Sequence, residues 1–215
     1  AAPKLDPAFF STTTFPSSAS AWWMRLKVRR RLTAKCRTRS LKASLTSLLK
    51  YGLKSHFDLG VTQELRLDHS VLVPLHFLTP SMDIPVVPLY VNGLVPPLPS
   101  AERCFALGQA LGQFIEELDG GLRVALIASG AFSLEVGGPR VGYTDEEWVS
   151  TVARLLGEGK YGSLAKRATA ERMYAAGNVS GELLCWITVV GALGDKRPLF
   201  VETDGGSGYA AWKLE

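Results

Sequence analysis

The sequence predicts a single α/β domain in which helices flank a mostly buried central sheet. First, apolar β-branched segments alternate with segments of helical periodicity, at a spacing typical of βα units. Second, a chain of 215 residues can bury a substantial core, and nothing after residue 55 has the composition of a linker. Third, 47% hydrophobic and 20% charged residues are typical of a globular protein.

The N-terminal elements follow from local patterns. Residues 1–20 are rich in Ser, Thr and Pro, which predicts an irregular lead-in. Leucines at helical spacing after Ser40 predict a helix, and the lysines at its end, up to Lys54, suit the negative end of the helix dipole. The β-branched residues of 84–92 predict a buried strand, although its two prolines favour a short or edge position. Residues 93–100 are expected to form a loop.

Capping residues place two helices in the C-terminal part. Ser100 is a predicted N-cap for a helix over 101–118. Thr144 and Glu147 have the spacing of a capping box, for a helix that ends near Gly157. The remaining predicted elements are a strand at about 123–129, helices at about 164–176 and 180–193, and strands at about 198–202 and 208–213.

The net charge of +4 hides a basic segment. No Asp or Glu occurs between Asp6 and Asp58. Nine of the cations of this interval cluster between residues 25 and 42, namely Arg25, Lys27, Arg29, Arg30, Arg31, Lys35, Arg37, Arg39 and Lys42. Such a segment can bind nucleic acid, form a solvated face or pack on an acidic partner. Nucleic acid is the weaker expectation, because no recognised nucleic-acid motif accompanies the charge.

Several classes of protein are not supported. No run of about 18 apolar residues predicts a membrane span, and the start of the chain lacks the pattern of a secretory signal. The three cysteines, Cys36, Cys104 and Cys185, are odd in number and form no CxxC, which argues against a disulfide framework or a zinc knuckle. A reducing compartment, the cytoplasm, is therefore expected.

Two residues are candidates for chemistry. His69 follows Asp68, a carboxylate that can hold an imidazole in one tautomer for acid/base work. Glu182 lies in the first turn of a predicted apolar helix. The structural alternatives stay open, because a histidine can cap a turn or fill the core, and a first-turn Glu is favoured by the helix dipole alone.

Four segments carry a resemblance to a known family. They are 64-ELRLDHSVLVPLHFL-78, 84-IPVVPLYVNGLVPPLPSAERCFALG-108, 138-GPRVG-142 with 145-DEEW-148, and 177-GNVSGELLCWI-187. In order and spacing they resemble the class III extradiol ring-cleaving dioxygenases. The resemblance implies an α/β fold around a non-haem Fe(II), held by two histidines and one glutamate, with open positions for a catechol-like aromatic and dioxygen.

The resemblance also implies roles for particular residues. His69 matches one of two further family histidines, which act on protons and oxygen near the substrate. Glu182 matches the carboxylate that binds the metal. Ser133, Pro139 and Arg140 are expected at the substrate.

The departures from the family pattern are as informative. Residues 1–55 contain no histidine, although the family keeps both iron histidines in its N-terminal segments. His56 matches neither of them. Leu134 stands where the family has its other catalytic histidine.

Three explanations of these departures remain. The chain is a silent subunit that pairs with an active paralogue, a paralogue with another role, or a sequence that lacks N-terminal residues. We expect a catalytically silent or incomplete family member, without iron of its own, in a homo- or hetero-oligomer. The alternative is an active Fe(II) dioxygenase whose N-terminal ligands are missing. In either case we expect residues 1–55 to be a basic, divergent or truncated N-terminal segment and 56–215 the dioxygenase-like domain, together forming one structural domain.

Overall fold

The chain divides into two compact units. The structure, a computed structural model, describes residues 8–11, 38–62, 67, 69–81, 84–118 and 122–213. The large unit contains residues 1–14 and 91–215, and the small unit contains residues 15–90.

The small unit contains two described helices, α1 (Thr38–Lys54) and α2 (His69–Leu78). Helix α1 confirms the predicted helix and ends on Lys54, as expected. The predicted strand at 84–92 is wrong, because this segment is irregular. Pro85 and Pro88 remove two of the N–H donors that a strand there would need. Most of the basic segment 25–42 lies outside the described residues.

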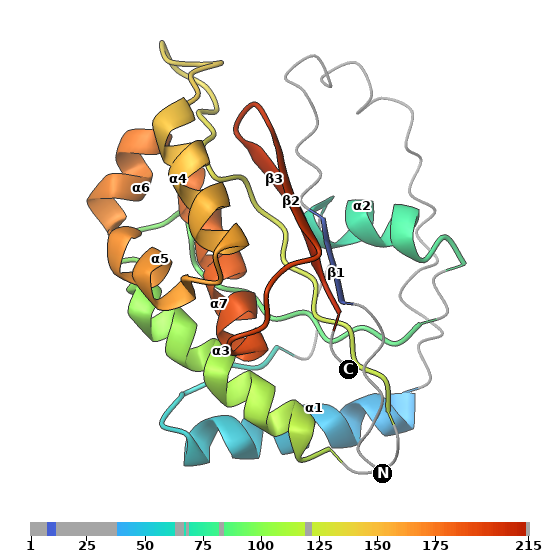
Figure 1. Cartoon of the computed structure of the whole chain (residues 1–215). Coiled ribbons are helices and arrows are strands. Elements are labelled where there is room, and N and C mark those ends of the chain that lie inside the picture. Colours follow the sequence, from blue (N-terminus) through green and yellow to red (C-terminus); the bar gives the residue numbers. More distant parts are fainter. Residues whose placement is uncertain are drawn as a thin grey trace. The chain divides into compact units, whose positions relative to one another are not determined.

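The large unit holds the other helices (Figure 1). They are α3 (Ala101–Glu116), α4 (Glu146–Gly157), α5 (Tyr161–Arg167), α6 (Ala170–Ala176), the 3-10 turn η2 (Ser180–Glu182) and α7 (Leu183–Leu193). Ser100 caps α3 as predicted, since its Oγ accepts a hydrogen bond of 3.1 Å from the Arg103 N–H. Asp145, rather than Thr144, caps α4.

One antiparallel sheet completes the large unit. Its strands β1 (Ala8–Ser11), β2 (Phe200–Asp204) and β3 (Ser207–Trp212) lie in the order β1-β3-β2. Strands β2 and β3 confirm the two predicted C-terminal strands, whereas β1 falls in the predicted irregular lead-in. Strand β3 is buried and β2 is mostly exposed.

The fold is a helix-rich mixture of helices and strands, and a mostly buried central sheet is not found among the described residues. The predicted strand at 123–129 is wrong as well, because this segment has no strand partner in the described structure.

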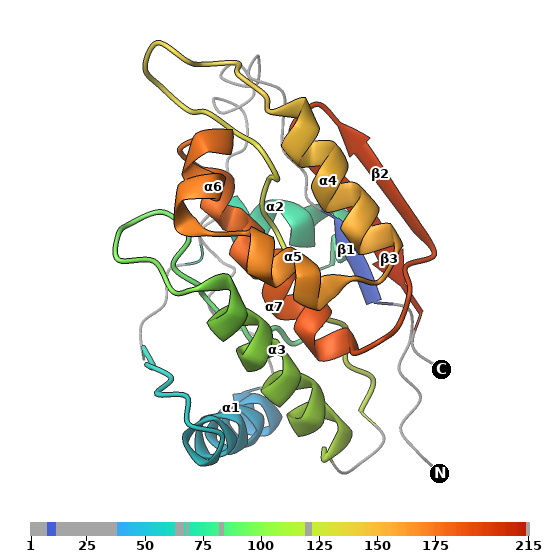
Figure 2. The same ribbon diagram turned by 60° about the vertical axis from the view of Figure 1, so that its left-hand side comes forward.

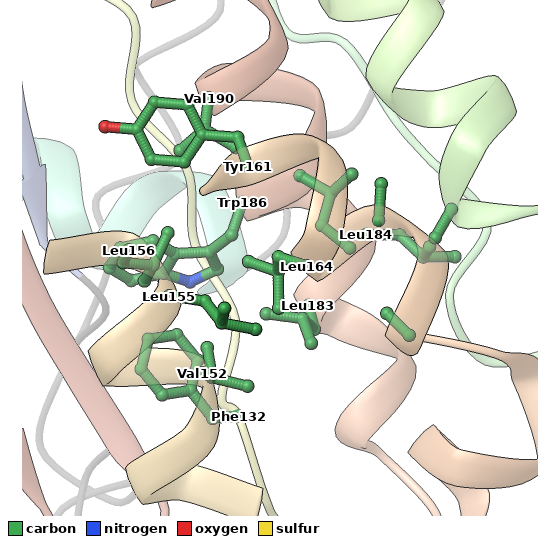
Figure 3. Close-up of a cluster of buried hydrophobic side chains, with 14 of the residues drawn as sticks. Phe132, Val152, Leu155, Leu156, Tyr161, Leu164, Leu183, Leu184, Trp186 and Val190 are labelled. Carbon is green, nitrogen blue, oxygen red and sulfur yellow. The ribbon is translucent and has the colours of Figure 1, made fainter. Parts of the chain in front are cut away.

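Helix α7 is the centre of the core. It packs against α3 and α5, while α4 packs against β2 and β3 (Figure 2). Nearly every side chain of α7 is buried, which suits its apolar sequence LLCWITVVGAL. Figure 3 shows Trp186 of α7 beside Leu156 and above Phe132, whose ring meets the indole edge-to-face at 5.0 Å. No helix in the described ranges is both long and apolar enough to cross a membrane.

Candidate functional site

Glu182 stands where two glycine-containing loops approach the start of α7. A Cβ added to Gly130 would lie 2.6 Å from the Cβ of Glu182, and one added to Gly93 would lie 2.5 Å from the carbonyl oxygen of Gly181. Gly130 also has a φ of 150°, a conformation that residues with a side chain rarely adopt. Only glycine fits this approach, so the sequence brings both loops into backbone contact with the carboxylate-bearing turn. We call Gly93, Gly130, Ala131, Gly181 and Glu182 the carboxylate site.

The Glu182 carboxylate is half-buried and hydrogen-bonded. Its Oε2 accepts a hydrogen bond of 3.1 Å from the Ala131 N–H. It lies at the N-terminus of α7, where the helix dipole favours a negative charge. The predicted metal ligand is thus a carboxylate held in place by the backbone of a neighbouring loop.

Ser133, a predicted substrate-binding residue, is buried and used within the fold. Its hydroxyl donates a hydrogen bond of 2.6 Å to the Ala176 carbonyl and accepts one of 2.8 Å from the Asp145 N–H. Ser133 as a whole is only 1% exposed. Through these two hydrogen bonds its hydroxyl joins the loop to α6 and to the start of α4. Its role toward a substrate stays a prediction.

Leu134, which the resemblance places where the family has a histidine, is fixed through its backbone. Its N–H donates a hydrogen bond of 2.9 Å to Ser180 Oγ, and its carbonyl accepts one of 3.1 Å from the Val179 N–H. A Cβ at Gly177 would overlap the Leu134 carbonyl. Position 134 therefore has a defined place near η2, but its half-buried side chain is aliphatic and cannot transfer a proton.

Pro139 and Arg140, the other predicted substrate-binding residues, lie on an exposed loop. The Arg140 guanidinium donates a hydrogen bond of 3.0 Å to the Ala175 carbonyl and lies 4.4 Å from the centre of the Tyr143 ring. Its nearest carboxylate oxygen, on Glu135, is 3.9 Å away. These contacts attach the exposed loop to α6, and the substrate roles stay predictions.

Asp145 connects this region to the helical layer. Its carboxylate caps α4 by accepting the Trp148 N–H at 2.9 Å, and it pairs with Arg172 at 2.8 Å. Burial raises the pKa of Asp145, but the Trp148 N–H and the Arg172 guanidinium outweigh it and hold the pKa below its usual value. The Arg172 guanidinium also stacks 4.5 Å from the centre of the Trp148 ring.

The three histidines all belong to the small unit. His69 is the first residue of α2 and is exposed, while its neighbour Asp68 lies outside the described residues. His76 is exposed on the same helix, where its ring meets Phe77 edge-to-face at 5.5 Å. His56 is exposed just beyond α1. The catalytic role of His69 stays a prediction.

The large unit does not supply the ligands that iron needs. Its sequence, residues 1–14 and 91–215, contains no histidine. Among the described residues no group of three or more His, Cys, Asp or Glu side chains could hold a metal ion. Glu182 alone does not match a site of two imidazoles and one carboxylate, so the residues present around it do not fit the iron that the family resemblance implies.

The nearby thiols do not replace the missing imidazoles. Burial, with the charges of Glu182 and Cys104, raises the pKa of Cys185 to about 12. Burial raises the pKa of Cys104 to about 11, although a hydrogen bond with Thr188 opposes it. Both thiols stay protonated at neutral pH, whereas metals bind the thiolate. Cys104 belongs to the core and Cys185 packs against it.

Two features of the site were not found from the sequence. The indole of Trp186 donates a hydrogen bond of 2.9 Å to the Gly130 carbonyl, and Asp145 joins the site to Arg172. The spacing of Glu182 and Trp186, four residues apart on a helix, was a visible signal. Their common target is more than fifty positions earlier in the chain, which no local pattern indicates.

Comparison with known proteins identifies relatives of the chain. Residues 24–210 match the family model described as the catalytic LigB subunit of aromatic ring-opening dioxygenase. A gallate dioxygenase of Pseudomonas putida is 33% identical over 144 residues, which cover 66% of this chain and 42% of the relative.

Further relatives carry another name. A 2,3-dihydroxyphenylpropionate/2,3-dihydroxicinnamic acid 1,2-dioxygenase of Klebsiella pneumoniae is 37% identical over 109 residues, 50% of this chain and 33% of the relative. The protein of the same name from Escherichia coli K12 matches to the same extent, 37% over 109 residues. The chain thus spans less than half the length of these curated relatives.

Proposed function

Because the chain belongs to the LigB family of aromatic ring-opening dioxygenases, we propose that it is a catalytically silent member of that family. It retains the fold and the Glu182 carboxylate but does not by itself bind catalytic iron or open a ring. One observation carries the proposal: the unit that holds Glu182 contains no histidine, and Leu134 occupies the place of the family's catalytic imidazole.

Chemistry explains why this observation supports the proposal. Two imidazoles and a carboxylate on one side of an Fe(II) leave the other side open for a catecholate and dioxygen. One carboxylate provides neither the affinity nor this geometry. Ring cleavage also needs a group that takes up and returns protons near the substrate, and a leucine cannot do so.

A silent chain of this kind acts through a partner. We infer that it forms an oligomer in the cytoplasm, either with copies of itself or with a paralogous chain whose site contains the missing imidazoles. A retained cavity for a catechol-like aromatic is compatible with this role, since binding does not require turnover. We further infer that residues 1–55 are a basic and divergent N-terminal segment that belongs to one structural domain with 56–215, since the family match begins at residue 24.

The test is anaerobic reconstitution of the purified chain with Fe(II), followed by iron analysis and a ring-opening assay. Gallate and 2,3-dihydroxyphenylpropionate are the probes, because they occur in the names of the relatives. We expect far less than equimolar iron and no ring-opened product. Equimolar iron with product formation would overturn the proposal. Sedimentation of the same sample tests the oligomer, and a strictly monomeric chain contradicts the partner role.

The alternative is an active Fe(II) dioxygenase whose further ligands lie outside this sequence. Its specific support is that His69 and Glu182 match family positions, and that the relatives are more than twice as long as the region they share with the chain. This alternative does not explain why a leucine stands at position 134, where the resemblance predicts a catalytic histidine. The same assay on a version extended at its N-terminus separates the two candidates, because only the alternative predicts iron binding after the extension.

A further inference from the structure

One peptide group is held from both ends by the start of α7. The Gly130 carbonyl and the Ala131 N–H belong to the same peptide and, in the trans form, point in opposite directions. The carbonyl accepts a hydrogen bond of 2.9 Å from Trp186 Nε1–H, and the N–H donates one of 3.1 Å to Glu182 Oε2. Both ends of this peptide are therefore bound by side chains of a single helical segment.

The spacing of the two side chains makes this arrangement possible. Glu182 and Trp186 are four residues apart at the junction of η2 and α7, so they project from the same face of the segment. Gly130 permits the approach because it has no side chain. A Cβ at this position would overlap the Glu182 side chain.

We infer that the hydrogen bonds of Glu182 and Trp186 together fix the Gly130–Ala131 peptide, and that Trp186 positions the Glu182 carboxylate through this peptide. A carbonyl that accepts a hydrogen bond polarises its peptide and strengthens the N–H as a donor. The indole therefore fixes both the direction and the strength of the bond to the carboxylate, without touching it. This gives Glu182 a function in a chain without iron histidines, and it holds whether or not the chain opens rings.

The burial of the parts supports a specific interaction. Trp186 is 1% exposed, so its N–H would be unsatisfied if the Gly130 carbonyl moved away. The same peptide begins the loop that carries Ser133 and Leu134. The Phe132 ring packs on the Trp186 indole, so the aromatic contact and the hydrogen bond hold adjacent residues of this loop.

Trp186→Phe in the full chain tests the inference, because it keeps an aromatic ring but removes the N–H donor. The readouts are the amide resonance of Ala131 and its hydrogen exchange, measured relative to the Val152 amide in α4. We expect the relative protection of Ala131 to fall by about fivefold or more, the loss of roughly one hydrogen bond. Its amide proton should also shift upfield. An unchanged Ala131 resonance and protection would overturn the inference.

Trp212→Phe is the matched control. Trp212 is equally buried, and its indole N–H also makes one hydrogen bond, of 2.8 Å, to the Tyr161 hydroxyl. This variant should lose stability while the relative protection of Ala131 stays unchanged. If Trp212→Phe lowers that relative protection as much as Trp186→Phe does, Trp186 has only a packing role and the inference fails.

A second pair of variants keeps the test valid if Trp186→Phe does not fold. Glu182→Gln retains an oxygen that accepts the Ala131 N–H, and Glu182→Ala does not. We expect Glu182→Ala to shift the indole N–H resonance of Trp186 and to expose Ala131 to exchange, and Glu182→Gln to restore both. If the indole N–H resonance of Trp186 does not change in Glu182→Ala, the two side chains are not coupled through the peptide, and the inference fails.

Discussion

The two compact units differ in the candidate site residues that they contain. The large unit contains the carboxylate, in a site that glycines, buried hydrogen bonds and the α7 core determine closely. The small unit contains all three histidines, and each is exposed. Packing and hydrogen bonds determine the position of Glu182, whereas the three imidazoles lie at exposed positions of the small unit. A carboxylate held by packing is therefore not by itself evidence of a reaction.

The largest expected effect compares a glycine from each unit. A Cβ at Gly108, on α3, would overlap the Thr188 carbonyl of α7, whereas one at Gly60 would meet nothing. We expect Gly108→Ala to lower the free energy of unfolding by about 3 kcal/mol, through forced separation of the two helices. Chemical denaturation measures it.

Two controls accompany this variant. Gly60→Ala in the small unit and Gly162→Ala on α5 both add a Cβ in open space, and neither should change stability by more than about 0.5 kcal/mol. If Gly108→Ala were equally neutral, the close crossing of α3 and α7 would not be what determines the core, and the contrast between the units would lose its basis.

The next effect tests Ser133, which was predicted to bind substrate. Its hydroxyl joins Ala176 to Asp145 in the buried part of the large unit. Ser133→Ala leaves the buried Ala176 carbonyl and the partly buried Asp145 N–H without this partner, and should cost about 2 kcal/mol in denaturant unfolding. Ser163→Ala, on the exposed side of α5, is the control and should cost less than about 0.5 kcal/mol. A neutral Ser133→Ala would leave the hydroxyl available for a ligand.

A smaller effect depends on pH. The pKa of Asp145 in the folded chain is below its usual value, so its contribution is present above the unfolded pKa of about 4 and is lost as the pH falls through the folded pKa. Arg172→Met should lower stability at pH 7 by about 1 kcal/mol. It should also make the loss of stability below about pH 4 less steep, as followed by thermal unfolding across pH.

Lys160→Met is the control for this pair. Lys160 lies 2.8 Å from a carboxylate oxygen of Glu158, but both side chains are largely exposed, so solvent screens them. The midpoint of thermal unfolding of Lys160→Met should equal that of the unaltered chain at each pH. Equal behaviour of the two variants would show that burial of the Asp145 pair has no consequence.

The successes and failures of the sequence have physical reasons. Helices α3 and α7 were predicted closely because a cap and a long apolar pattern are local signals. The segments 84–92 and 123–129 have the composition of strands, but composition does not supply a pairing partner. Neither segment forms a strand in the described structure. The single helix predicted at 164–176 is two, because Thr169 caps α6 by accepting the Arg172 N–H at 3.1 Å.

The candidate site was predictable only in part. Glu182 was correctly placed at the start of an apolar helix. The target of its carboxylate, the Ala131 N–H, depends on how a distant loop is folded, and sequence spacing holds no information about that. The same is true of the partners of the Ser133 hydroxyl, the Ala176 carbonyl and the Asp145 N–H, which no local pattern indicates.

The smallest expected effect concerns Leu134, and it bears most directly on function. Its backbone is held by Ser180 and Val179, and its side chain is half-buried, so Leu134→His should change stability by less than about 1 kcal/mol. Under the proposed function, the variant gains the imidazole that the resemblance predicts at this position but none of the iron histidines. We therefore expect it to bind no more Fe(II) than the unaltered chain and to open neither gallate nor 2,3-dihydroxyphenylpropionate. Leu134→Ala is the control for the loss of the leucine itself. Ring opening by Leu134→His alone would contradict the proposed function, because it would mean that iron ligands exist and that only an acid/base group is missing.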